Sequence, residues 1–282
     1  MIRIFIGFDP LETVAFHTLA HSILARSTMP VSIIPLNLKN LGGLITRERN
    51  PLQSTEFSFS RFLTPYLSDY EGWSIFMDCD MLVLDDIANL WNLRNNHYAI
   101  QVVKHHHVPK EEIKFLNATQ TKYEKKNWSS VMLFNNARCK ALTQDYVNTA
   151  SGLELHQFKW LENDELIGEI PSKWNHLVGY DEPRSDASLV HYTIGGPYFK
   201  QWTDCEYAKE WCDEREAMLF AQQVEMAGDV PADVPDTTLV EADTTSPVTE
   251  AVEIEADTPT TSNVEVDTPT VTETVEVKTE AS

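Results

Sequence analysis

The chain has 282 residues, of which 42% are hydrophobic, 10% aromatic and 23% charged, a composition typical of a globular protein with a sizeable core. Its net charge of −21 argues against duplex nucleic acid, and against an anionic membrane surface, as the main partner. The excess of acid is concentrated near the C-terminus, where residues 222–282 hold 15 acidic residues and one basic residue, Lys278. The body of the chain, residues 1–221, is only mildly acidic.

The first residues predict a strand over 2–6, which begins almost at the N-terminus. They lack a basic segment followed by an apolar stretch and a cleavage site, so we expect no signal peptide. No apolar run approaches the roughly 20 residues that span a bilayer, so we expect no transmembrane segment. The four cysteines form no CxxC pair and no disulfide-type spacing, which indicates reduced thiols and a cytoplasmic protein.

Apolar patterning predicts that strands and helices alternate along residues 1–221. The expected strands are short apolar runs at residues 2–6, 31–36, 73–77, 81–84, 98–103, 131–134 and 189–192. The expected helices are apolar stripes at 16–23 and 59–66 and a stretch that ends at Leu93. This alternation predicts an α/β fold with a mainly parallel, mixed sheet flanked by helices, and ligands outside the carboxyl ends of its strands.

Residues 222–282 predict a disordered acidic tail. From about residue 227 the chain contains no aromatic residue, is rich in Thr, Glu, Asp, Val and Pro, and loosely repeats Glu-Ala-Asp-Thr. Such a segment buries too little apolar surface to offset a backbone ordering cost of roughly 1–2 kcal/mol per residue. The alternation of Val with acids leaves an edge strand as the alternative, which the prolines disfavour.

The sharpest motif is Asp78-Cys79-Asp80, which lies between the apolar runs 73–77 and 81–84. Unpaired carboxylates are costly in such surroundings, and Mn²⁺ or Mg²⁺ offsets that cost because it prefers carboxylate oxygens and also bridges phosphates. The alternative is a helix cap or a solvated turn at a strand end. Strand alternation predicts that the Cys79 side chain turns away from the two carboxylates into the core.

Several motifs, in their order along the chain, resemble the core of family 8 glycosyltransferases. They are Ser58-Phe-Ser-Arg61-Phe-Leu, Ile75-Phe-Met-Asp78-Cys-Asp80, Trp128-Ser-Ser-Val-Met-Leu-Phe-Asn135, Asn163-Asp164-Glu165, Trp174-Asn175 and His191-Tyr-Thr-Ile-Gly195-Gly196-Pro-Tyr198. The resemblance covers about residues 1–220 and implies a GT-A fold. It also implies a metal-dependent hexosyltransferase that moves a sugar from a nucleotide-diphosphate sugar donor to a glycan or another hydroxyl acceptor, with retention.

The resemblance implies roles for individual residues in donor and metal binding. Asp9 would contact the nucleoside and Arg61 the donor. Asp78 and Asp80 would hold Mn²⁺ or Mg²⁺, with Asp78 also touching the ribose. His191 would complete the metal site as a neutral imidazole ligand, and the alternative for this residue is a satisfied core histidine.

Other implied roles concern the reacting sugar and the diphosphate. Asp164, with Glu165 beside it, would stabilise positive charge in the transition state or act as a nucleophile. Trp128 begins a run that replaces the Asn-Ala-Gly of the family and changes the pocket wall beside the sugar. The final motif also lacks the lysine with which the family meets the diphosphate. The backbone N–H groups of Gly195 and Gly196, or the nearby Lys200, could substitute for it.

Two other functions remain open from the sequence. A non-catalytic nucleotide-sugar or glycan-binding protein would have the same fold and the same donor contacts. A sugar nucleotidylyltransferase is disfavoured because the first strand leads to Gly7-Phe-Asp9-Pro10 rather than to a glycine-rich loop with an arginine.

Overall fold

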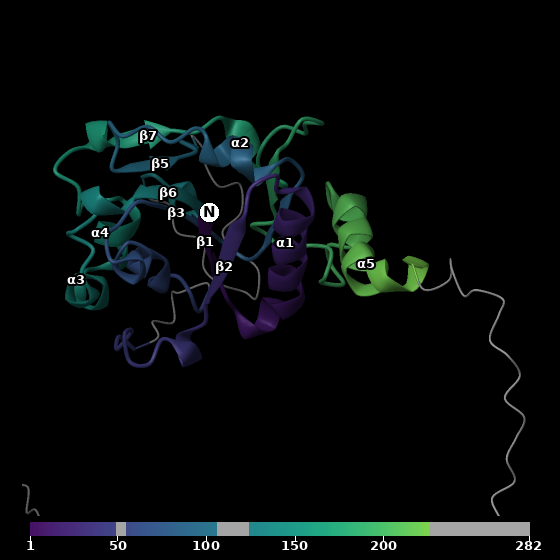
Figure 1. The fold of residues 1–282 in the computed structure, drawn as a ribbon, viewed down its shortest axis with the longest axis horizontal. Coiled ribbons are helices and arrows are strands. Elements are labelled where there is room, and N and C mark those ends of the chain that lie inside the picture. Colours follow the sequence, from purple (N-terminus) through teal and green to yellow (C-terminus); the bar gives the residue numbers. More distant parts are fainter. Residues whose placement is uncertain (49–54, 106–123, 226–282) are drawn as a thin grey trace, which may run out of the picture. The chain divides into compact units, whose positions relative to one another are not determined.

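A six-stranded sheet forms the centre of the computed structural model, in the order β2-β1-β3-β6-β5-β7 (Figure 1). Its strands are β1 (Ile2–Gly7), β2 (Val31–Leu36), β3 (Trp73–Met77), β5 (Ile100–Val102), β6 (Val131–Asn135) and β7 (Ile167–Glu169). The pairs β1–β2, β1–β3 and β5–β7 are parallel, whereas β6 is antiparallel to both of its neighbours. The predicted mainly parallel, mixed sheet is therefore confirmed.

A second, three-stranded sheet has the order β4-β9-β8 and comprises β4 (Met81–Val83), β8 (His176–Leu177) and β9 (Leu189–His191). β4 is antiparallel to β9, and β8 is parallel to it. Only three residues connect β3 of the large sheet to β4 of the small one. These three residues are Asp78, Cys79 and Asp80, so the predicted metal motif lies at the junction of the two sheets.

The helices are α1 (Thr13–Arg26), α2 (Ile87–Trp91), α3 (Gln144–Thr149), α4 (Gly152–His156) and α5 (Ala208–Glu225). α1 packs against β4 and lies beside α5 (Figure 1). The apolar stripe predicted as a helix at 59–66 forms two 3₁₀ turns instead, Ser60–Leu63 and Tyr66–Ser68. Pro65 accounts for the interruption, because it has no N–H to donate to a helical carbonyl four residues earlier.

The core is centred on the large sheet. Ile4 and Ile6 of β1 and Ile75 and Phe76 of β3 are completely buried, as expected for strands covered on both faces. A smaller apolar cluster, which includes Leu82, Val190, Tyr192 and Trp211, joins the small sheet to α5. All four cysteines are free.

The structure describes residues 1–48, 55–105 and 124–225, all within one compact unit, Met1–Val230. Residues 222–225 of the predicted disordered tail belong to the end of α5, and the rest of the tail, from 226 onward, lies outside the described residues. In the described part of the chain, no helix is both long enough and apolar enough to cross a membrane.

Candidate active site

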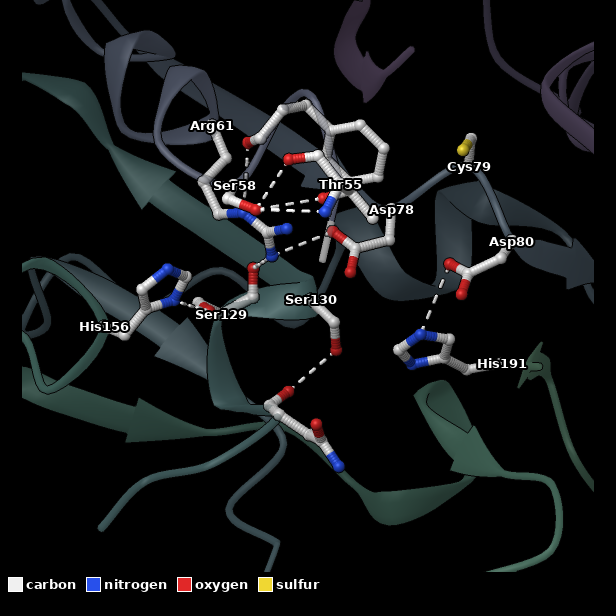
Figure 2. Close-up of polar contacts among 12 residues, drawn as sticks. Thr55, Ser58, Arg61, Asp78, Cys79, Asp80, Ser129, Ser130, His156 and His191 are labelled. Carbon is white, nitrogen blue, oxygen red and sulfur yellow. Dashed lines mark hydrogen bonds and ion pairs between the residues drawn. The ribbon is translucent and has the colours of Figure 1, made fainter. Parts of the chain in front are cut away.

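Three predicted metal ligands meet at the junction of the two sheets. Asp78 directly follows β3, Asp80 directly precedes β4, and His191 is the last residue of β9 (Figure 2). One ligand atom from each of the three side chains lies within 4.8 Å of the others, and His191 Nε2 is 3.3 Å from Asp80 Oδ1. The strand register produces this meeting, because Met81 of β4 lies opposite His191.

This donor set fits a divalent cation. Asp80 Oδ1 is buried, and its 3.3 Å contact with His191 Nε2 does not have hydrogen-bond geometry, so it accepts no hydrogen bond from the described residues. The Asp78 and Asp80 side chains are only 13% and 16% exposed, so two carboxylates that repel one another are held largely out of water. A divalent cation relieves that repulsion, and carboxylate oxygens with one neutral imidazole nitrogen are suitable ligands for it.

Arg61 compensates part of the charge on Asp78. Its Nη1 lies 2.9 Å from Asp78 Oδ1 and donates to the Ser129 carbonyl oxygen, also at 2.9 Å (Figure 2). The residue is buried, and its guanidinium lies about 5 Å from the ring centres of Phe57 and Phe76. Arg61 is therefore held rigidly beside the candidate metal site rather than free in solvent.

A cavity of about 60 Å³ opens at this cluster. Its lining consists of Glu12, Thr55, Arg61, Asp78, Asp80, Asn127, His191, Tyr192, Thr193 and Gly195. The cavity thus combines both carboxylates, the imidazole and the guanidinium, which come from three segments far apart in the sequence. Such a concave polar site is suited to a charged small molecule or to one end of a larger ligand.

Glu12 is a member of this site that the sequence analysis missed. Its Oε1 accepts a 2.9 Å hydrogen bond from the Tyr198 hydroxyl, and its Oε2 accepts a 3.6 Å hydrogen bond from Cys79 Sγ. Burial, and next the Asp80 carboxylate, raise the pKa of Glu12 to about 8. Glu12 follows β1 by five residues, in the turn at its carboxyl end, so the rule that ligands lie outside the carboxyl ends of strands could have found it.

Cys79 is buried and its sulfur points away from the two carboxylates, as strand alternation predicted (Figure 2). Burial, followed by the nearby carboxylates of Glu12, Asp80 and Asp78, raises the pKa of the Cys79 thiol well above its ordinary value. The thiol therefore stays protonated and serves as a hydrogen-bond donor to Glu12.

Asp9 is buried at the carboxyl end of β1 but does not line the cavity. Its Oδ1 accepts from the Leu11 N–H at 2.9 Å and its Oδ2 from the Glu56 N–H at 3.2 Å. Both carboxylate oxygens thus hold backbone of the surrounding loops. A nucleoside contact of Asp9 remains a prediction.

Of the other residues predicted to contact the donor, Gly195 lines the cavity and Trp128 follows a residue that lines it. Gly195 lines the cavity and has φ = 130°, and a Cβ there would lie 2.5 Å from the Trp202 ring. Its N–H donates to the Tyr192 carbonyl at 2.9 Å, and Lys200 is exposed. A diphosphate contact of the Gly196 N–H or of Lys200 remains a prediction. Trp128 is half-buried, next to the cavity residue Asn127.

Asp164 and Glu165 are exposed and belong to the 3₁₀ turn Asp164–Leu166 that precedes β7. Asp164 Oδ1 lies 2.6 Å from Lys125 Nζ, which also donates to the Gln157 carbonyl at 2.9 Å. Neither carboxylate lines the cavity. Their catalytic role remains a prediction.

Comparison with known proteins finds a relative that is similar over most of this chain. No protein-family model matches the chain. Protein CDI of Arabidopsis thaliana is 50% identical over 223 residues, which cover 76% of this chain and 86% of that protein. General stress protein A of Bacillus subtilis (strain 168) is 24% identical over 163 residues, which cover 49% of this chain and 56% of that protein.

Among solved structures, the glycosyltransferase GlyE in Streptococcus pneumoniae TIGR4 matches with a TM-score of 0.53 at 13% identity. The match covers 80% of this chain but only 64% of the GlyE chain. The fold is therefore similar to that of the glycosyltransferase GlyE, which agrees with the GT-A-type α/β fold that the resemblance implies. The assignment to family 8 in particular remains a prediction.

Proposed function

The chain belongs to the family of Protein CDI of Arabidopsis thaliana, and we propose that it is a metal-dependent glycosyltransferase. It transfers a hexose from a nucleotide-diphosphate sugar to a hydroxyl group of a glycan or another acceptor, with retention at the anomeric carbon. The glycosyltransferase fold supports the reaction class.

One observation carries this proposal: Asp78, Asp80 and His191 converge in a single cavity of a glycosyltransferase fold. A bound Mn²⁺ or Mg²⁺ would act as a Lewis acid that neutralises the leaving diphosphate. Asp78, Asp80 and His191 would hold the ion. Donor phosphate oxygens are suitable ligands for the positions that these three side chains leave open.

The other residues would bind and orient the donor. Arg61 already has Asp78 and the carbonyls of Phe57 and Ser129 as partners, and it also lines the cavity, where it would donate to donor oxygens. Gly195 lets the loop after β9 pass close to the donor. Asp164, or Glu165 beside it, would stabilise positive charge on the sugar during transfer.

A two-part experiment tests the proposal. Thermal unfolding is measured with a panel of UDP-sugars and GDP-sugars, with and without MnCl₂, because specific binding raises the apparent stability by mass action. Nucleotide release from the same donors is then followed. We expect one donor to raise the melting temperature only in the presence of Mn²⁺ and to release its nucleoside diphosphate slowly, even with water as acceptor.

The other functions give different outcomes. A non-catalytic binding protein would show the thermal shift without nucleotide release. A nucleotidylyltransferase would instead release pyrophosphate from a nucleoside triphosphate and a sugar phosphate. Wild-type protein that neither binds nor hydrolyses any donor in the panel in the presence of Mn²⁺ would contradict the proposal.

A further inference from the structure

His191 is held by a chain of buried hydrogen bonds that leads away from the carboxylates. Its Nδ1 lies 3.0 Å from Asn175 Oδ1, and Asn175 Nδ2 donates to Ser130 Oγ at 2.8 Å. Ser130 Oγ in turn donates to the Asn127 carbonyl oxygen at 2.7 Å. Asn175, Ser130 and His191 are each at most 3% exposed, so water does not compete for these bonds.

The direction of every hydrogen bond in this chain follows from the acceptor at its end, the Asn127 carbonyl oxygen. The Asn127 carbonyl oxygen can only accept, so the single hydroxyl proton of Ser130 points to it. Ser130 Oγ must then accept from Asn175, which turns the amide NH₂ toward Ser130 and the amide oxygen toward His191. An amide oxygen accepts only, so His191 Nδ1 must carry a proton.

This arrangement determines where the His191 lone pair lies. A neutral imidazole with a proton on Nδ1 has its lone pair on Nε2. Nε2 is the atom that faces Asp80 Oδ1 at 3.3 Å. A flipped Asn175 amide would produce the opposite tautomer, in which an Nε2 proton would face Asp80 and prevent His191 from binding a cation.

The flipped arrangement loses a well-formed hydrogen bond, and the contact of an Nε2 proton with Asp80 Oδ1 at 3.3 Å does not have hydrogen-bond geometry in this structure. Ser130 Oγ would have to donate to the Asn175 oxygen, and the Asn127 carbonyl would lose its 2.7 Å hydroxyl donor. Ser130 is also fixed by its own backbone, because its carbonyl oxygen accepts from the Asp78 N–H at 3.0 Å. One serine thus links the backbone of Asp78 to the side chain that orients His191.

We propose that Ser130 and Asn175 are positioning residues that hold His191 in the Nδ1–H tautomer, with the Nε2 lone pair directed at the Asp78–Asp80 carboxylates. The metal-binding consequence rests on the proposed function, whereas the tautomer itself does not. Hydrogen-bonding partners of this kind orient metal-binding histidines, and their loss typically lowers metal affinity about 10–100-fold.

The first measurement is the tautomer of His191 in metal-free protein. Long-range ¹H–¹⁵N correlation spectra of ¹⁵N-histidine-labelled protein are recorded at pH ~8, above the ordinary histidine pKa of about 6.5. We expect the Nδ1–H pattern for His191 in the wild type and in Asn175→Asp, whose carboxylate accepts from Nδ1. We expect Asn175→Ala and Ser130→Ala to lose this preference. An Nε2–H pattern in the wild type would overturn the inference.

The second measurement is the affinity for MnCl₂ alone, followed by the electron paramagnetic resonance signal of free Mn²⁺. Asn175→Ala and Ser130→Ala should bind about 10–100-fold more weakly than the wild type. Asn175→Asp should restore much of the affinity lost in Asn175→Ala. Equal affinity of the two alanine variants and the wild type would overturn the inference.

The chain offers a matched control at the opposite end of β3. Asn136 Nδ2 donates to Ser74 Oγ at 2.8 Å, and both residues are completely buried. Asn136→Ala and Ser74→Ala therefore remove the same kind of buried bond without touching His191. They should leave the Mn²⁺ affinity and the His191 spectrum unchanged, even where they lower the melting temperature.

The two proposals can fail separately. Wild-type protein with an Nδ1–H His191 but no Mn²⁺ binding would contradict the proposed metal dependence and leave the tautomer assignment intact. Tight Mn²⁺ binding that is equally insensitive to Asn175→Ala, Ser130→Ala and the controls would contradict the positioning role alone.

Discussion

Arg61 Nη1 lies 2.9 Å from Asp78 Oδ1 in a buried ion pair, and Asp78 is also a candidate metal ligand. The same carboxylate thus has a permanent partner on one side and faces the cavity on the other. Because Arg61 offsets only one charge, Asp80 remains largely uncompensated beside it. The stability of this region should therefore depend on both the guanidinium and the cation.

Replacing Arg61 should destabilise the protein most when metal is absent. Removal of one partner from a buried ion pair typically costs about 3–5 kcal/mol, because it leaves an uncompensated charge. Urea unfolding of Arg61→Met should show a loss of this order in EDTA and a smaller loss in excess Mn²⁺. Arg138→Ala removes an exposed arginine that only donates to the Asn96 and His97 carbonyls, and should change the unfolding free energy little. Equal losses for Arg61→Met with and without Mn²⁺ would contradict the prediction.

Asp80→Asn should stabilise the metal-free protein and abolish its response to Mn²⁺. The substitution removes a largely buried charge that repels Asp78 and raises the pKa of Glu12, at the expense of a metal ligand. Differential scanning fluorimetry should show a higher melting temperature than the wild type in EDTA and no further rise with MnCl₂. The exposed Asp204→Asn is the control and should retain the wild-type response. A Mn²⁺ response of Asp80→Asn as large as that of the wild type would remove Asp80 from the metal site.

Glu12 should make the metal-free protein less stable as the pH rises. The folded protein, with a Glu12 pKa of about 8, keeps a proton that the unfolded chain releases near its ordinary pKa of 4.5. The retained proton stabilises the folded protein, and this contribution of Glu12 to the unfolding free energy is complete below pH 4.5 and is lost as the pH rises to about 8. The unfolding free energy should fall by at most about 1.4 kcal/mol per pH unit in this interval.

Glu12→Gln should flatten that part of the stability curve, because glutamine has no proton to release and still accepts from Tyr198. The measurement is urea unfolding in EDTA between pH 5 and 8. Glu154→Gln is the control. Hydrogen bonds from Ser151 lower the pKa of Glu154 from its ordinary value of 4.5, so Glu154 changes the pH dependence of the unfolding free energy only below the measured pH range. A wild-type slope that persists in Glu12→Gln would show that another group titrates.

Asp164→Asn tests the predicted catalytic carboxylate. Removal of a group that acts mainly in the transition state should lower kcat far more than it changes donor affinity. Lys125→Met is a useful companion, because Lys125 Nζ is the 2.6 Å partner of Asp164. If Asp164 only forms this exposed ion pair, both variants should keep the wild-type rate of nucleotide release, and Asp164 would then have no catalytic role.

Truncation after residue 225 should leave the fold and the donor chemistry intact. The removed segment contains no aromatic residue to anchor it and has strong charge self-repulsion. The melting temperature and the Mn²⁺-dependent donor shift of the truncated protein should match those of the full chain. A melting temperature several degrees lower would indicate that the segment docks on the body.

Local patterns in the sequence were sufficient to predict the longest strands of the large sheet. The predicted strands at 31–36 and 73–77 agree with β2 and β3, because short, mainly apolar runs that end at Asn37 and Asp78 are typical of buried strands. β7 and β8 have three and two residues, too short for any periodicity, and only their partners define them. α5 has 18 residues but no continuous apolar stripe, and within its described part the completely buried apolar anchor is Trp211.

The sequence by itself also determined the chemical character of the site. Asp78 and Asp80 between apolar runs indicate a cation, and the resemblance added His191, which lies 111 residues beyond Asp80. Only the tertiary structure decided which atoms meet. The β4–β9 register brings His191 to Asp80, and the buried turn after β1 brings in Glu12. The hydrogen bond that Asn175 donates to Ser130 orients the imidazole. Hydrogen-bond direction between segments 45 residues apart leaves no local pattern, because each residue is compatible with many partners until the fold supplies one.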